Sequence, residues 1–210
     1  MLAACESSGR VRDAFAARGW DAWSCDLEPS ETPGQHIQAD ILKAFDFGPW
    51  DLIISFPPCT DLSLAGARFW AQKRADGRQD AAAEFFMRMY GAPSLRIAVE
   101  NPRGDMSRRF RKPNQVVEPW WFGDPFVKQT CLWTFGLPAL VPDKPVTPEF
   151  RVATGGGSWR TDRAAERKAM SAYEDSEGRK NRAKVRSRTF PGVARAMASQ
   201  WGAWIEGGCK

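Results

Sequence analysis

The sequence predicts an α/β fold in which a mostly parallel sheet is covered by helices on both faces. Short apolar segments recur along residues 1–110 without alternating with polar residues, and segments of helical periodicity separate them. Strands that are apolar on both sides are typical of parallel sheets buried between two layers of helices. Ligands of such sheets bind beyond the carboxyl ends of the strands, so the residues there are the candidates for function.

The predicted elements of the first half follow one another in regular order. Residues 2–5 form an apolar strand, and Gly9 precedes a helix that ends at Gly19. Asp80 is a suitable N-cap for a later helix. The other strands are expected at residues 20–25, 50–56 and 95–99, and the other helices near residues 41–45 and 80–90.

The sequence of the second half predicts segments that lie beside this core. Residues 114–142 are aromatic and extended, which favours antiparallel strands at the sheet edge. Residues 143–188 lack apolar periodicity and are rich in glycine and charge, which predicts a loop-rich insertion. Residues 189–210 are expected to return to the core as a helix. Its apolar face would carry Val193, Met197, Trp201 and Trp204.

Composition limits the class of protein. The 210 residues carry a net charge of +5, which suits a nucleic-acid partner without demonstrating one. No apolar run approaches the roughly 20 residues that cross a bilayer, and the first residues lack the basic region of a secretion signal. We expect a cytoplasmic protein with no membrane partner.

Cysteine and histidine usage narrows the chemistry. The five cysteines are scattered and form no Cys-x-x-Cys pair, which argues against a disulfide framework. His36 is the only histidine, so zinc sites and Ser-His-Asp catalysis are poorly supplied. We therefore expect no metal, and any catalysis must use cysteine, carboxylate, lysine or arginine side chains.

The most informative segment follows the predicted strand at residues 50–56. Pro57 and Pro58 end the strand and direct the next side chain, the thiol of Cys59, into the region where ligands bind. A cysteine taken at random is more often a buried structural residue. Its position after a rigid turn at a strand end makes Cys59 a candidate nucleophile.

This segment resembles the nucleophile motif of the cytosine-C5 DNA methyltransferase family, which runs Pro-Pro-Cys-Gln, then Phe-Ser, then Ala-Gly. Thr60 replaces the glutamine, and Leu62 is a conservative match. The family also ends a later strand with Glu-Asn-Val, to which Glu100 and Asn101 correspond. The identical positions of the first motif are Pro57, Pro58, Cys59, Ser63, Ala65 and Gly66.

Weaker correspondences follow in the same order as in the family. Asp26 corresponds to a carboxylate that holds ribose hydroxyls, and Asp40 to the aspartate that contacts the adenine amine. Lys128, after Gly123-Asp124-Pro125, corresponds to a base-contacting arginine. The first loop of the family, Phe-x-Gly-x-Gly-Gly, departs most, because only Gly9 remains of its glycines.

The resemblance implies a Rossmann-like fold that uses S-adenosylmethionine to methylate C5 of cytosine in DNA through a covalent bond between Cys59 and C6. The implied catalytic residues are Cys59, Glu100, whose carboxyl group contacts N3, and Lys128. The implied cofactor-binding residues are Glu6, Ser7, Ser8, Gly9, Asp26, Asp40 and Pro57. The implied substrate-binding residues are Pro58, Ser63, Asn101, Arg179, Lys180, Arg182, Lys184 and Arg186.

In this interpretation residues 1–142 form the catalytic core, residues 143–188 a reduced basic recognition region, and residues 189–210 a closing helix. Two alternatives stay open. The same chemistry could act on a free cytosine nucleotide or a single strand, or the chain could be an inactive relative that binds DNA or S-adenosylmethionine. So compact a form suits a phage or a bacterial host and favours a monomer.

Overall fold

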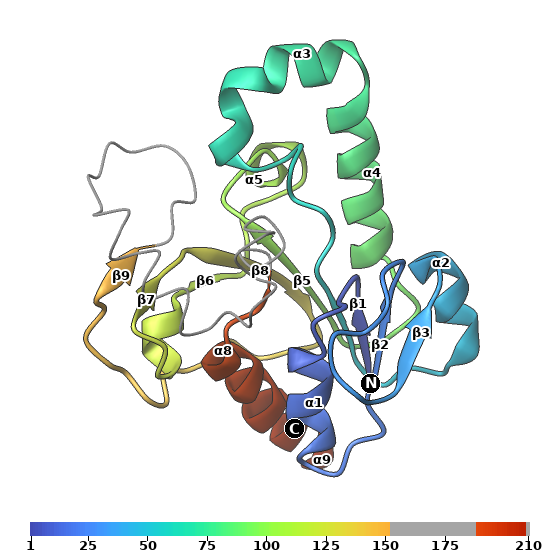
Figure 1. Cartoon of the computed structure of the whole chain (residues 1–210), viewed down its shortest axis with the longest axis vertical. Coiled ribbons are helices and arrows are strands. Elements are labelled where there is room, and N and C mark those ends of the chain that lie inside the picture. Colours follow the sequence, from blue (N-terminus) through green and yellow to red (C-terminus); the bar gives the residue numbers. More distant parts are fainter. Residues whose placement is uncertain (152–187, 209–210) are drawn as a thin grey trace.

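Seven strands form the main sheet of the computed structural model, which describes residues 1–151 and 188–208 (Figure 1). Strands from β3 to β5 run parallel to their neighbours, whereas β8 is antiparallel to both β5 and β6. In spatial order the strands are β3 (His36–Gln38), β2 (Trp23–Asp26), β1 (Leu2–Ala4), β4 (Ile53–Ser55), β5 (Ile97–Pro102), β8 (Thr130–Phe135) and β6 (Gln115–Val117).

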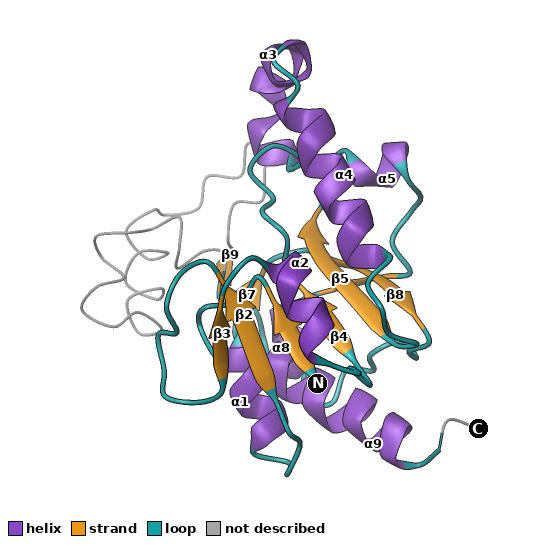
Figure 2. Ribbon diagram, turned by 90° about the vertical axis from the view of Figure 1, so that its right-hand side faces the viewer, coloured by secondary structure: helices purple, strands orange, loops and turns teal. Residues whose placement is uncertain are grey.

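Helices cover both faces of this sheet (Figure 2). One face carries α1 (Arg10–Ala16) and, from the end of the chain, α8 (Pro191–Ala196), the π-helical turn η4 (Met197–Trp201) and α9 (Gly202–Glu206). The other face carries α2 (Ile41–Ala44) and α4 (Arg78–Tyr90). The predicted α/β class, with a mostly parallel sheet between helices, is confirmed.

Shorter elements complete the described chain. The helical arm, which we define as η2 (Leu64–Phe69) and α3 (Trp70–Ala75), projects beyond the carboxyl edge of the sheet (Figure 1). No helix among the described residues is long and apolar enough to cross a membrane. The remaining elements are η1 (Phe45–Phe47), α5 (Met106–Arg109), η3 (Pro119–Phe122) and the two-stranded sheet of β7 (Phe126–Val127) and β9 (Phe150–Arg151).

Alternate strand residues pack against the two helical layers. Ile54 and Leu132 face α1 and the C-terminal helices, while their neighbours Ile53 and Trp133 face α2 and α4. All four side chains are fully buried. This burial on both faces explains why the strands read as continuous apolar runs.

Strand β3 was missed, because the sequence after Asp26 predicts a loop. The strand has no apolar run and forms by pairing in parallel with β2, with His36 opposite Ser24. The two side chains also meet, with 2.9 Å between the imidazole Nδ1 and the hydroxyl oxygen. The only histidine therefore joins two strands.

The antiparallel strands expected in residues 114–142 are present as β6 and β8. The C-terminal helix begins at Pro191 as expected, but its apolar face shifts. Met197 and Trp201 are fully buried, whereas Trp204 is 37% exposed. The π-helical turn η4 adds one residue to a turn, so Ile205 takes the inward position that regular spacing assigns to Trp204.

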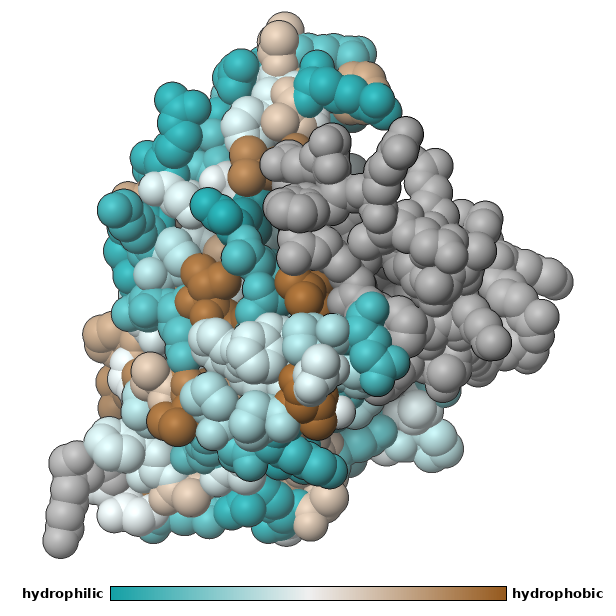
Figure 3. Space-filling model, turned by 90° about the vertical axis from the view of Figure 1, so that its left-hand side faces the viewer, coloured by the Kyte–Doolittle hydropathy of each residue, from teal (hydrophilic) through white to brown (hydrophobic). Residues whose placement is uncertain are grey.

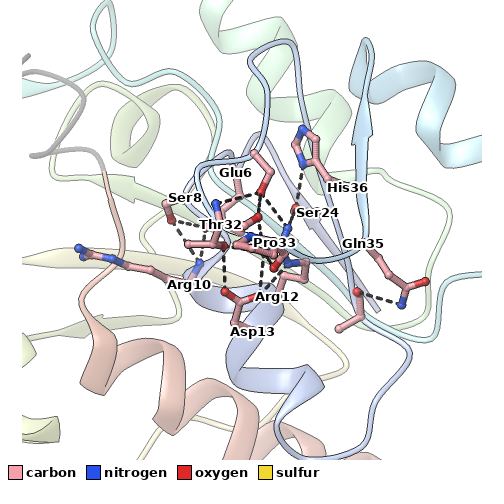
Figure 4. A network of polar contacts seen from close by, with 12 residues as sticks. Glu6, Ser8, Arg10, Arg12, Asp13, Ser24, Thr32, Pro33, Gln35 and His36 are labelled. Carbon is pink, nitrogen blue, oxygen red and sulfur yellow. Dashed lines mark hydrogen bonds and ion pairs between the residues drawn. The ribbon is translucent and has the colours of Figure 1, made fainter. Parts of the chain in front are cut away.

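A buried arginine connects α1 with the loop between β2 and β3 (Figure 4). Arg12 is 1% exposed, and its guanidinium group donates to the hydroxyl groups of Ser24 at 3.1 Å, Ser30 at 3.0 Å and Thr32 at 2.7 Å. It also donates to the carbonyl oxygens of Thr32 and Pro33. One side chain thus holds a loop that lies beside the end of β1, because a guanidinium group offers five N–H donors.

We predict that Arg12→Met lowers the free energy of unfolding by about 3 kcal/mol, because several buried acceptors lose their donor together. Chemical denaturation followed by circular dichroism measures the change. Arg18→Met is the control: its partner Glu206 is half exposed, so the loss should not exceed about 1 kcal/mol. Equal losses in the two variants would contradict a structural role for Arg12.

Candidate active site

The carboxyl ends of β4 and β5 lie side by side, because the two strands pair in parallel. Asn101, 1% exposed, donates a hydrogen bond from its side chain to the carbonyl oxygen of Pro57 at 3.1 Å. The bond fixes the turn after β4 against β5. Cys59 follows this turn and Glu100 precedes Asn101, so the predicted nucleophile and carboxyl group share one edge of the sheet.

Buried side chains hold the backbone after Cys59. Lys73, 6% exposed on α3, donates to the carbonyl oxygen of Thr60 at 2.6 Å and pairs with the Asp61 carboxylate at 2.9 Å. Gln79, fully buried on α4, donates to the carbonyl oxygen of Asp61 at 3.2 Å. The segment is therefore fixed relative to the helical arm.

The same segment docks against the chain that follows β5. Gly104 permits the approach, because a Cβ atom there would lie 2.1 Å from the carbonyl oxygen of Leu62. Backbone hydrogen bonds close the contact on both sides, from Asp105 N to Leu62 O at 2.9 Å and from Leu64 N to Arg103 O at 3.0 Å. A larger residue at 104 would displace the loop.

The residues of the nucleophile motif divide by role. Cys59 is half-buried, and its carbonyl oxygen accepts the N–H of Ser63 at 2.9 Å, which closes a turn. The hydroxyl of Ser63 accepts the N–H of Ala65 and caps η2. Pro57 is buried, whereas Pro58 is exposed. Asn101 and Ser63, predicted to bind substrate, thus make contacts within the chain.

Lys128 reaches the edge that carries Glu100. Strand β8 pairs antiparallel with β5, with Thr130 opposite Pro102, so the residues just before β8 lie beyond the end of β5. The ammonium group of Lys128 lies 5.6 Å from the centre of the Phe190 ring. Lys128 therefore lies close enough to Glu100 for its charge to act on that carboxyl group, at the edge of the sheet where β4 also ends.

The Glu100 carboxyl group stays neutral to higher pH than a free glutamic acid. Burial raises its pKa, and the positive charge of Lys128 acts in the opposite direction. No hydrogen bond from the described residues reaches this carboxyl group. A neutral carboxyl group can donate a hydrogen bond to a ring nitrogen of a ligand.

The other described cysteines are unsuited to nucleophilic attack. Burial is the main cause that raises the pKa of Cys5 to about 12, of Cys25 to about 11 and of Cys131 to about 12. Only a thiolate is a strong nucleophile, so these three cysteines act as neutral, apolar side chains. Among the described cysteines, Cys59 is the candidate for chemistry.

A cavity of about 80 Å³ lies beyond β1 and β2 at the same edge. Gly9, at the start of α1, has φ +74°, and a Cβ atom there would lie 2.1 Å from Thr32 Oγ1. The loop held by Arg12 therefore comes close to this site. The cavity is lined by the predicted cofactor residues Glu6, Ser7, Ser8 and Asp26, and by Cys5, Glu31, Phe56, Arg188 and Thr189.

The two predicted cofactor aspartates follow β2 and β3. Asp26 Oδ1 accepts the N–H of Glu28 at 3.0 Å, and Asp40 caps α2 by accepting the N–H of Leu42 at 3.0 Å. Both carboxylates contribute to the raised pKa of Cys5, so they lie near the cavity. A carboxylate after the second strand commonly holds ribose hydroxyls in nucleotide-binding sheets.

The residues at this cavity fit an adenosyl cofactor. Asp26 offers a carboxylate for hydroxyl groups, and Glu6 keeps one buried carboxyl oxygen, Oε2, without a hydrogen-bond partner. A ligand donor would satisfy that oxygen. No three His, Cys, Asp or Glu side chains of the described residues gather into a metal site.

The predicted DNA-contacting residues Arg179, Lys180, Arg182, Lys184 and Arg186 lie outside the described residues. Arg188, at the end of that basic run, is described, and its guanidinium group pairs with Glu31 at 2.5 Å. Sequence reasoning missed this pair because 157 positions separate its members. It also missed Lys73 on α3 and Gln79 at the start of α4, since a single buried polar residue leaves no periodic pattern.

No family model and no curated protein matches this chain. Among solved structures, the chain is similar to a protein assigned as a DNA modification methyltransferase and encoded within prophage Cp of E. coli. The two chains share 17% sequence identity with a TM-score of 0.46, over 70% of this chain and 52% of that one. This chain therefore spans about half the length of that structure.

Proposed function

We propose that this protein transfers a methyl group from S-adenosylmethionine to C5 of cytosine in DNA. The supporting observation is that a half-buried cysteine, a carboxyl group whose pKa is raised by burial and a lysine lie at one edge of the sheet. A cavity lined by carboxyl groups lies at the same edge. These side-chain types match the roles that the cytosine-C5 methyltransferase resemblance assigns to Cys59, Glu100 and Lys128.

In the proposed reaction, the thiolate of Cys59 forms a bond to C6 of cytosine, and electron density moves towards N3 and C5. The neutral carboxyl group of Glu100 donates a hydrogen bond to N3 and stabilises the negative charge gained by the ring. S-adenosylmethionine supplies the methyl group that C5 takes up. A base removes the proton from C5, the bond between sulfur and C6 breaks, and the thiolate returns.

The anchored loop suits this chemistry. Attack at C6 requires the sulfur to approach one face of the ring while a carboxyl group meets its edge, which demands fixed geometry. The hydrogen bond from Asn101 to Pro57 and the contacts of Lys73 supply that rigidity. A cytosine in a duplex would first be flipped out of the stack to reach the site.

Exposed arginines around the helical arm support a polyanionic substrate. The acidic side chains of this region already pair: Asp61 with Lys73, Asp76 with Arg78, and both Asp80 and Asp105 with Arg109. In Figure 3 hydrophilic side chains predominate at the projecting end. The exposed guanidinium groups without a carboxylate partner among the described residues belong to Arg68, Arg74, Arg103 and Arg108.

The arm also offers an exposed aromatic ring. Phe69 is 46% exposed, and the guanidinium carbon of Arg68 lies 4.6 Å from the centre of its ring. Aromatic rings beside cations are typical of surfaces that stack bases and neutralise phosphates. The basic run at residues 179–188 is proposed to add to this surface.

We predict that Cys59→Ala abolishes methyl transfer, because no other described thiol is suited to attack. DNA containing 5-fluorocytosine should form a covalent adduct with the wild type, detected by denaturing electrophoresis, and none with the variant. Cys131→Ala, the matched control, should keep the adduct because it removes a thiol whose pKa is about 12. An adduct formed by Cys59→Ala would contradict the mechanism.

Glu100→Gln should slow the single-turnover rate by on the order of 10²-fold or more, because positioned acid catalysis is lost. In the wild type the rate should also fall as pH rises through the raised pKa of Glu100, since only the neutral form donates to N3. Rapid-quench measurements across pH test both effects. An unchanged rate in the variant would make Glu100 a strand-end residue without a catalytic role.

Arg68→Ala with Arg74→Ala should weaken binding to duplex DNA of any sequence. The slope of log affinity against log salt should fall by up to about two, roughly one for each lost phosphate contact. Fluorescence anisotropy at several salt concentrations measures the slope. The control, Arg18→Ala with Arg96→Ala, removes two cations away from the arm and should leave the slope unchanged; equal slopes in both double variants would exclude the arm from DNA binding.

A further inference from the structure

The backbone of Lys128 is held by a side chain from another segment. The pairing of β6 with β8 ends at Val117 and Thr130, and Lys128 lies two residues before Thr130, beyond the end of this ladder. Its backbone N–H group donates a hydrogen bond to Oε2 of Glu118 at 2.8 Å. The chain that leads into β8 is therefore tied to the end of β6.

Glu118 makes this contact through its side chain because its backbone turns away from the sheet. Its carbonyl oxygen accepts the N–H of Trp121 at 3.1 Å, and η3 begins with the next residue, Pro119. Proline has no N–H group to offer to a neighbouring strand. The chain after β6 thus enters η3 instead of extending the ladder, and the carboxylate of Glu118 bridges the distance to Lys128.

Two further contacts fix the same lysine. The hydroxyl of Thr130 donates to the carbonyl oxygen of Lys128 at 3.2 Å, and the Lys128 ammonium group lies 5.6 Å from the centre of the Phe190 ring. A cation at this distance is attracted to an aromatic ring. Phe190 is only 7% exposed and packs on Phe126, with 5.0 Å between the ring centres. The end of β6, the start of β8 and the residue before α8 all hold Lys128.

The position of Lys128 determines the charge that Glu100 meets. Burial raises the pKa of Glu100, and Lys128 is the charged group among the described residues that lowers it. The two strands beside Glu100 bring other titratable groups: β4 leads to Cys59, and β8 carries Cys131, a neutral thiol on which Glu100 and Arg103 both act. A displacement of Lys128 would therefore be felt at Glu100.

We propose that Glu118 is a positioning residue that holds Lys128 beside the carboxyl group of Glu100. The inference rests on the proposed function for its catalytic meaning, since Glu100 there donates a hydrogen bond to N3 of cytosine. Glu118 acts through Lys128, by fixing the backbone from which the lysine side chain extends. This role requires an acceptor atom at position 118 and not a negative charge, so a glutamine there should serve equally well.

NMR titration of the carboxyl carbon of Glu100, assigned by the loss of its signal in Glu100→Gln, tests the placement without requiring turnover. A nearby positive charge lowers the pKa of a carboxyl group, so its removal raises the midpoint of the titration. Lys128→Met should raise the midpoint by on the order of one pH unit. Glu118→Met, which has no acceptor atom, should raise it in the same direction, whereas Glu118→Gln should keep the wild-type midpoint.

The single-turnover rate gives the second measurement. Because only neutral Glu100 donates to N3, the decline of the rate at high pH should move upward in Glu118→Met together with the midpoint. A residue that merely stabilised the fold would lower the amount of active protein without moving that decline. Glu149→Met is the matched control: Glu149 is an exposed carboxylate whose backbone N–H binds the carbonyl oxygen of Pro125, and its loss should change neither the midpoint nor the rate.

Three results would overturn the inference. They are an unchanged midpoint in Lys128→Met, a Glu118→Gln variant that titrates like Lys128→Met, and a Glu118→Met variant that is folded by circular dichroism and titrates like the wild type. The first two stand even if Glu118→Met does not fold. A wild type that forms no 5-methylcytosine, although its variants show the expected midpoints, overturns the proposed function and leaves the placement of Lys128 by Glu118 intact.

Discussion

The buried hydrogen bond from the side chain of Asn101 to the carbonyl oxygen of Pro57 determines the geometry of the candidate site. Parallel pairing brings the ends of β4 and β5 together, but it does not fix the turn that leaves β4. Pro57 has no N–H to donate to the sheet, so its carbonyl oxygen is the backbone group through which a hydrogen bond can fix it. The contacts of Lys73, Gln79 and Gly104 then fix the residues that follow Cys59, so the whole loop is held in place.

The sheet could be predicted because its strands are buried on both faces, and continuous apolar runs such as Leu52-Ile53-Ile54 result directly from that burial. Strand β3 could not be predicted, since its formation depends on backbone pairing with β2 and not on side-chain burial. The exposure of Trp204 could not be predicted either. A π-helical turn changes the spacing of a helix only through its hydrogen bonding, and residue types do not encode that shift.

The candidate site was predictable at the strand ends, where a rule of chain geometry brings Cys59, Glu100 and Asp26 to one edge whatever the details of packing. The side chains that hold this edge in place were not predictable. Arg12 and Lys73 are cations, which sequence patterns assign to the surface, yet each is buried by partners that only the folded chain brings near. The cost of burying these two charges is offset because the hydrogen bonds that they donate all end on oxygen atoms.

Many sheets of this strand order offer the first turn of the helix after β1 to a phosphate group. Here the carboxyl group of Glu6 already occupies that turn by accepting the N–H of Arg10. A pyrophosphate approaching this turn would meet the carboxyl group of Glu6, which already accepts the N–H of Arg10. The first turn of α1 thus presents a carboxyl group where those sheets present N–H donors that are free to bind a ligand.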